Sequence, residues 1–147
     1  MKKTSLLLSS LACILLLVAC DFNAPLRNKM INYYAQDDVY YELQGQIASI
    51  EYNKDTDILF LEIDLESNNY DFPINAETEY CEFNIVNWSA YEFNLKTNDV
   101  VVFWSAPMRF YNGHRPPIVG LRKNDVQYIS LEDGKDNYIN WIKEKFD

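Results

Sequence analysis

The chain has 147 residues, of which 48% are hydrophobic, 24% are charged and 15% are aromatic. Its 22 acidic and 13 basic residues give a formal net charge of −9, which argues against binding to nucleic acid and against docking on anionic lipid through a basic face. The length suits one hydrophobic core and is too short for two, so a single domain is expected.

Lys2 and Lys3 precede a short apolar segment that ends in small residues and Cys20. A charged start, a short hydrophobic stretch and small residues before a cut site are typical of an export signal and not of a membrane span. The run Leu17-Val18-Ala19-Cys20 resembles the lipobox of bacterial lipoproteins, in which a branched apolar residue and small residues precede the cysteine.

The resemblance implies that residues 1–19 are a lipoprotein signal peptide that is removed, and that the Cys20 thiol carries a diacylglycerol. Residues 20–24 then form the lipidated end and a short tether, and residues 25–147 form the single domain. Because two acyl chains hold a protein firmly, the domain is expected at the extracytoplasmic face of a cell membrane. Loss of the signal changes the formal charge to about −11.

The cysteines agree with this interpretation. Cys13 leaves with the signal and Cys20 is lipidated, so Cys81 remains alone and no intramolecular disulfide is expected. Stability must then come from core packing. No other apolar run reaches the roughly 18 residues that a membrane-spanning helix needs.

The mature chain is predicted to open with a helix, because Pro25 suits a first helical turn and apolar residues then recur at helical spacing to about Gln36. Alternating apolar residues next predict three strands, at Val39–Tyr52, Ile58–Leu65 and Tyr80–Val86. In the first strand the parity of the apolar residues changes after Gly45, which predicts a bulge or sharp bend there.

The third strand alternates, and its residues are expected to point inward (Cys81, Phe83 and Ile85) or outward (Glu82 and Asn84). The period then changes. Asn87 is a good N-cap, and Trp88, Tyr91 and Leu95 follow at helical spacing, which predicts a short helix that ends near Lys96.

The rest of the chain is predicted to hold two or three strands and a last helix. Val100–Ala106 is a nearly continuous apolar run, typical of a buried strand, and Pro107–Pro117 is a long loop. Ile118–Leu121 and Val126–Leu131 are predicted strands. A C-terminal helix is expected after Gly134, with one apolar side.

The predicted fold class is mainly β with flanking helices. The order of three strands, a helix and two or three strands resembles the OB-fold, a small and partly open Greek-key barrel, over residues 39–131. In that family the helix after the third strand closes one end of the barrel, and the loop between strands four and five helps to frame the ligand face. A two-sheet sandwich or an open α+β sheet has the same elements and stays a second possibility.

The long loop is the best candidate for a functional site, because it combines cationic and aromatic side chains in an otherwise acidic domain. Arginine with aromatic rings can hold a carboxylate, a phosphate or a sugar ring. The candidate ligand-binding residues are Trp104, Arg109, Phe110, Tyr111, His114 and Arg115. The predicted role is a non-enzymatic binding module for an anionic or hydroxylated partner, either an envelope protein or a glycan. The alternative is a rigid loop whose arginines pair with local acids.

An extracytoplasmic enzyme is the competing class. Cys81 with His114 would form a thiol–imidazole pair, although a lone inward cysteine usually behaves as a small hydrophobe. Glu62 and Asp64 would form a carboxylate pair, although neighbours on one strand face are usually a solvated surface. No cofactor is expected, and one histidine with one free cysteine gives too few soft ligands for zinc.

Calcium is disfavoured as well. Asn53, Asp55 and Asp57 have the spacing that opens a calcium loop, but Ile58 stands where glycine is required and Asp64 where a bidentate glutamate is expected. A solvated hairpin turn is therefore predicted.

A tyrosine cluster raises a third class, a structural lipoprotein of an envelope assembly. Tyr33, Tyr34, Tyr40 and Tyr41 lie near the membrane-proximal end and would offer a contact surface if they were exposed. The favoured alternative is that these tyrosines pack beneath the first helix.

Overall fold

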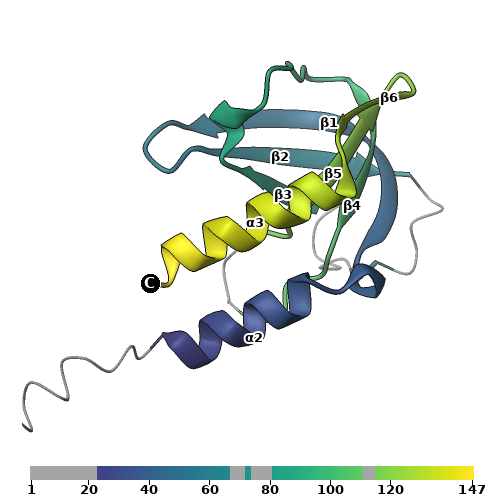
Figure 1. Ribbon diagram of the computed structural model, residues 1–147. Helices are drawn as coiled ribbons and strands as arrows, with labels where there is room; N and C mark the ends of the chain where they lie inside the picture. Colours follow the sequence, from purple (N-terminus) through teal and green to yellow (C-terminus); the bar gives the residue numbers. More distant parts are fainter. Residues whose placement is uncertain (1–22, 67–71, 74–80, 111–114) are drawn as a thin grey trace, which may run out of the picture.

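The computed structural model describes residues 23–66, 72–73, 81–110 and 115–147 (Figure 1). The predicted signal and Cys20 lie outside these residues. The helices are α2 (Ala24–Tyr34) and α3 (Leu131–Lys145), and short 3-10 turns lie at Asp37–Val39 and Trp88–Ala90. The strands are β1 (Tyr41–Asn53), β2 (Ile58–Leu65), β3 (Cys81–Val86), β4 (Val100–Ser105), β5 (Ile118–Lys123) and β6 (Val126–Ile129).

The strands form one six-stranded antiparallel sheet in the order β3-β2-β1-β4-β5-β6. The predicted class, mainly β with flanking helices, is therefore confirmed. The sheet is not closed into a barrel, although one parallel bridge between Asn84 and Pro117 brings β3 next to the start of β5.

The long strand β1 bends as predicted, but its bulge lies at Ala48 and not at Gly45. The register with β2 shifts between Ile47, which is opposite Ile63, and Ser49, which is opposite Glu62. Gly45 has a different role. A Cβ atom there would lie 2.5 Å from the Asp64 carbonyl oxygen, so only glycine lets β1 approach the backbone of β2 this closely.

Two apolar clusters stabilise the domain, one on each face of the sheet. The inner face buries Leu43, Ile47, Leu59, Leu61, Ile63, Phe72, Phe83, Ile85, Val101, Phe103, Ile118, Leu121 and Ile129. The cluster between the outer face and the helices contains Met30, Tyr34, Ile58, Val86, Ala106, Val119, Tyr138, Trp141 and Ile142. Burial of apolar area on both faces is the main source of stability for a domain of this size.

The two helices run antiparallel, with α3 against β5 and β3 and α2 beside α3 (Figure 1). At one end Arg27 pairs with Asp147 at 2.8 Å, and at the other the rings of Tyr34 and Tyr138 meet edge to face at 4.9 Å. The N-terminal end of α2 and the C-terminal end of α3 are therefore neighbours.

The helix predicted from Asn87 to Lys96 is wrong. Asn87 precedes only a single 3-10 turn, its φ of 50° lies in the left-handed region, and its side chain makes no capping hydrogen bond. The chain then runs extended, and Tyr91, Phe93 and Leu95 pack against the inner cluster at a spacing of two. The segment is extended and not helical because the extended spacing places all three side chains against the core.

The last helix begins earlier than predicted. Ser130 is its N-cap and accepts a hydrogen bond from the Asp133 backbone N–H at 3.1 Å, so β6 ends at Ile129. Gly134 lies inside the helix, where a Cβ atom would come within 1.8 Å of the Val119 carbonyl oxygen. Glycine thus permits close packing of α3 on β5.

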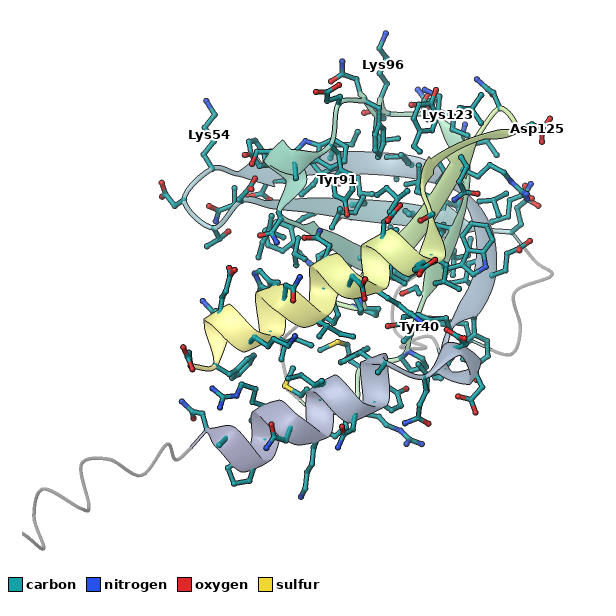
Figure 2. All side chains as sticks on the ribbon, in the orientation of Figure 1. Tyr40, Lys54, Tyr91, Lys96, Lys123 and Asp125 are labelled. Atoms are coloured by element: carbon teal, nitrogen blue, oxygen red, sulfur yellow. The ribbon has the colours of Figure 1, made fainter. Side chains whose placement is uncertain are left out.

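Tyr34 and Tyr40 pack at the first helix as the favoured alternative expected, whereas Tyr41 does not. Tyr34 is fully buried, and Tyr40 points toward α2 and donates a hydrogen bond through its hydroxyl to the Tyr34 carbonyl oxygen at 2.7 Å (Figure 2). Burial raises the pKa of Tyr34 to about 12 and raises the pKa of Tyr40 and of Tyr138 as well. Tyr41 is 36% exposed and packs edge to face on Phe72.

Candidate functional site

A small pocket lies on the outer face of β1 and β2, beyond the area that the helices cover. It is a shallow depression with a cavity volume of about 30 Å³. Its lining residues are Ser49, Glu51, Phe60, Leu61, Glu62 and Arg115. The strands supply every wall except one, which comes from Arg115 in the segment that leads into β5.

The bulge at Ala48 creates one wall of this pocket. Beyond the bulge, Ser49 stands opposite Glu62 and Glu51 stands opposite Phe60. The Ser49 hydroxyl donates a hydrogen bond to Glu62 Oε2 at 2.7 Å. An unbroken alternation along β1 would have put these side chains on the other face, since a shift by one residue reverses the direction of each side chain.

Arg115 covers the pocket and is held by two neighbours. Its Nε donates to Glu82 Oε2 at 2.7 Å, and its guanidinium lies 4.4 Å from the centre of the Phe60 ring. Glu82 in turn stands directly opposite Glu62 across β3 and β2. Glu51 and Glu62 line the same pocket, so three carboxylates and one guanidinium lie in or beside it and the site as a whole is acidic.

Asn84 was predicted to face solvent, but it is only 4% exposed. Its Nδ2 donates to the Arg115 carbonyl oxygen at 2.9 Å, and its backbone N–H donates to the Pro116 carbonyl oxygen at 3.0 Å. The prediction is wrong because the segment 115–117 lies alongside the edge strand β3 and bonds both the backbone and the side chain of Asn84. The buried Ser105 hydroxyl holds the same segment by donating to the Pro117 carbonyl oxygen at 2.8 Å.

The predicted site residues at the start of the loop lie elsewhere. The Arg109 side chain is exposed and its guanidinium lies 5.2 Å from the centre of the Tyr33 ring on α2. Phe110 packs edge to face on the same ring at 5.4 Å. Arg109 and Phe110 thus contact α2, whereas Arg115 contacts β2 and β3.

Trp104 lies on β4, where the Arg122 guanidinium is 5.9 Å from the centre of its ring and Gly120 lies directly beneath the ring. It is not among the residues that line the pocket. Tyr111 and His114 lie outside the described residues. Of the predicted set, Arg115 is therefore the one described residue that lines the pocket.

Sequence reasoning missed most of the strand residues of the site. Ser49, Glu51 and Phe60 were not singled out, and Glu62 was noted only as a partner of Asp64. The signal that identifies them is the parity change in β1, because it moves Ser49 and Glu51 to the face of Phe60 and Glu62. The notion of a bend was available, but its position was placed three residues early.

The enzyme alternatives gain little from the geometry. Glu62 lines the pocket, whereas Asp64 is exposed and does not. Cys81 begins β3 and pairs with Ile63 in the ladder, but its side chain, like His114, lies outside what the structure describes. In the described part of the chain, no three His, Cys, Asp or Glu side chains gather as metal ligands would.

The turn between β1 and β2 is a hairpin turn, as predicted. Asn53 Oδ1 accepts hydrogen bonds from the backbone N–H groups of Asp55 and Thr56, at 3.0 and 3.2 Å. Asp57 accepts from the Ser89 hydroxyl at 2.6 Å and from Tyr52 at 2.8 Å. Burial opposes ionisation of Asp57, but the hydrogen bonds from Ser89 and Tyr52 outweigh it and lower the pKa.

Asn137 on α3 connects the helix to β3 and to the extended segment after the 3-10 turn. Asn137 on α3 donates through Nδ2 to the Tyr91 hydroxyl at 2.9 Å and to the Val86 carbonyl oxygen at 3.0 Å, and Figure 2 shows Tyr91 between the strands and α3. Lys54 and Lys96 point away from the domain in the same view. This edge therefore carries solvated lysines and forms no part of the pocket.

Comparison with protein-family models, with curated proteins and with solved structures found no match. Among the described residues, no helix has both the length and the apolar character that crossing a membrane requires.

Proposed function

We propose that the chain is an exported, lipid-anchored binding module whose Arg115 pocket holds a hydroxylated ligand, with an envelope glycan as the natural class. The observation that carries this proposal is the mixture of groups in the pocket, namely a guanidinium, a hydroxyl and carboxylates beside an aromatic ring. Sugar hydroxyls can donate to carboxylates and accept from a guanidinium or a serine at the same site.

The charge of the pocket favours a hydroxylated ligand over the anionic one that the sequence also allowed. Glu51 and Glu62 line the pocket together with Arg115, and Glu82 already pairs with Arg115. A phosphate or carboxylate ligand would meet these acids at close range, and like charges repel. A neutral polyol meets no such penalty.

An OB-like arrangement is part of the proposal. The central strand β1 lies between β2 and β4. The Asn84–Pro117 bridge brings β3 next to the start of β5, which are the two outer strands of the set β3-β2-β1-β4-β5. The pocket lies on the strands and is covered by a residue of the loop between β4 and β5. Strands two and three with this loop are the region that OB-folds use to bind ligands.

The lipid anchor is supported by the lipobox and by the place where α2 begins. Only residues 21–23 separate Cys20 from Ala24 at the start of the helix. A fully extended tether of that length reaches roughly 14 Å, so an anchored domain stays close to the membrane surface. Mass spectrometry of the exported protein should find residues 1–19 absent and acyl chains on Cys20, and an intact amino terminus would contradict the anchor.

The binding test uses the mature lipidated protein in detergent with a panel of neutral and phosphorylated oligosaccharides. We expect neutral glycans to be retained, and Glu62→Gln to weaken retention by about ten-fold or more, because a hydrogen bond to a charged group contributes roughly 1.5–3 kcal/mol. Asp64→Asn is the matched control, since Asp64 lies on the same strand face but outside the pocket. Equal retention by both variants, or retention of phosphorylated glycans alone, would overturn the proposal.

A further inference from the structure

We infer that Asn84 is the positioning residue for Arg115, and so determines whether the pocket has a guanidinium at its edge. The inference deepens the proposed function and rests on it only for the consequence in ligand binding. Its structural part concerns two side chains and is testable without a ligand.

Asn84 contacts the Arg115 backbone directly, and it also lies beside the aromatic ring that the Arg115 side chain contacts. Through Nδ2, Asn84 holds the Arg115 carbonyl oxygen at 2.9 Å, which fixes the backbone of Arg115 over β3. In the ladder, Asn84 also stands opposite Phe60, the ring on which the Arg115 guanidinium lies at 4.4 Å. Asn84 thus fixes the position of the Arg115 backbone next to Phe60, the residue that the Arg115 guanidinium contacts.

Within the described part of the chain, the Asn84 side-chain amide uses only one of its two polar atoms. Its Oδ1 is buried and has no hydrogen-bond partner among the described residues, while its Nδ2 is satisfied. A buried polar group with one end unpaired costs stability, and an apolar side chain of similar size would avoid that cost. The amide is therefore explained by what Nδ2 does, which is to hold the Arg115 carbonyl.

The neighbouring contacts do not perform this task. The Asn84 backbone N–H holds Pro116 and the Ser105 hydroxyl holds Pro117, so both secure the segment beyond Arg115. These contacts persist when the Asn84 side chain is changed. The segment should then stay attached to β3 while the Arg115 backbone and guanidinium lose their fixed place.

The experiment measures the exchange of the Arg115 Nε–H with water by ¹H–¹⁵N NMR on the full mature protein. Arg115→Ala assigns the signal by removing it. In the unaltered protein the hydrogen bond to Glu82 should slow the exchange, and Asn84→Leu should accelerate it at least ten-fold. The Arg122 signal, from an arginine that contacts Trp104, serves as an internal reference and should not change.

Two further variants separate positioning from general loosening. Asn84→Asp keeps the shape but removes the donor, so it should accelerate the exchange as Asn84→Leu does. Ile85→Val removes packing from the opposite face of β3 and should lower the melting temperature without changing the Arg115 signal. Unchanged exchange in both Asn84 variants, or equal acceleration by Ile85→Val, would overturn the inference.

The ligand measurement is kept separate from the NMR result. If Arg115 is positioned by Asn84 and the pocket binds neutral glycans, Asn84→Leu should weaken their retention as much as Arg115→Ala does. If Glu62→Gln leaves retention unchanged while the Asn84 variants still accelerate the exchange, the proposed function fails and the positioning of Arg115 stands.

Discussion

The outer face of β2 is buried at one end of the strand and exposed at the other, and different parts of the molecule cover the two ends. Ile58, at 9% exposure, lies in the cluster under the helices, whereas Asp64 at the other end is exposed. Between them, Phe60 and Glu62 line the pocket, and one loop residue, Arg115, covers Phe60. The helix-covered end is sealed by apolar packing, and the pocket end is covered by a single polar side chain.

This difference separates stability from binding in the same sheet. Apolar cover contributes in proportion to the buried area and does not depend on salt or on a partner. A guanidinium held by one carboxylate and one ring contributes little to folding, but it presents donors and acceptors to a ligand. Substitutions at the two ends should therefore have very different effects on unfolding.

The largest effect is expected where α3 rests on β5. Gly134→Ala would place a Cβ atom within 1.8 Å of the Val119 carbonyl oxygen, so α3 must shift away from the sheet. Overpacking of this kind outweighs the gain of about 1 kcal/mol in helix preference, and the net loss in the free energy of unfolding should be roughly 3 kcal/mol. Urea denaturation measures it.

The control for this prediction is a substitution at the exposed end of β2. Asp64→Ala removes an exposed side chain at the end of β2 and should change the free energy of unfolding by less than about 0.5 kcal/mol. Similar losses in the two variants would show that the helix-covered end and the open end do not differ as described.

An intermediate effect is expected at alkaline pH, again on the helix-covered side. Burial raises the pKa of Tyr34 to about 12, above its ordinary value of 10.0, so the folded state retains the proton that the unfolded state loses. The stability is complete below pH 10 and is lost as the pH rises towards 12, by up to about 1.4 kcal/mol per pH unit for one tyrosine. Tyr40 and Tyr138 shift in the same direction.

Ultraviolet absorbance of tyrosinate provides the measurement. The buried tyrosines, Tyr34, Tyr40 and Tyr138, should ionise only when the domain unfolds. The Tyr34→Phe variant should reduce the alkaline loss of stability. If all tyrosines ionised in one step near pH 10 with the domain still folded, the helix side would be more open to water than its packing indicates.

Much of the sheet was predictable because its strands have a simple period. Ile58–Leu65 alternates with Leu59, Leu61 and Ile63 toward the core, and the structure has a strand with those bounds. The segment after β3 was not predictable in this way. Trp88, Tyr91 and Leu95 fit a helical period, while Tyr91, Phe93 and Leu95 fit an extended one, and only the position of the core decides between them.

The site was predictable only at its loop. Arg115 was notable as a cation in an acidic chain, but Arg109 was equally notable and contacts Tyr33 of α2 instead. Which of the two reaches β2 depends on the contacts of Asn84 with the segment at 115–117, and these contacts join residues far apart in the sequence. A parity change at Gly45 or at Ala48 puts Ser49 and Glu51 on the same face, so the position of the bulge did not hide them. They were not predicted because the sequence does not show that Arg115 reaches this face.

The smallest effect on stability is expected at the pocket itself. Glu82 is half exposed and Arg115 is 31% exposed, so their 2.7 Å ion pair lies near water and is screened by salt. Glu82→Gln should therefore lower the free energy of unfolding by less than about 1 kcal/mol, and a double-mutant cycle with Arg115→Ala should give a coupling of similar size that decreases at high salt. A coupling well above that value, unchanged by salt, would mean that Arg115 belongs to the folded core. The open end of β2 would then be sealed like the helix-covered end, and a ligand would have to displace a structural residue to enter.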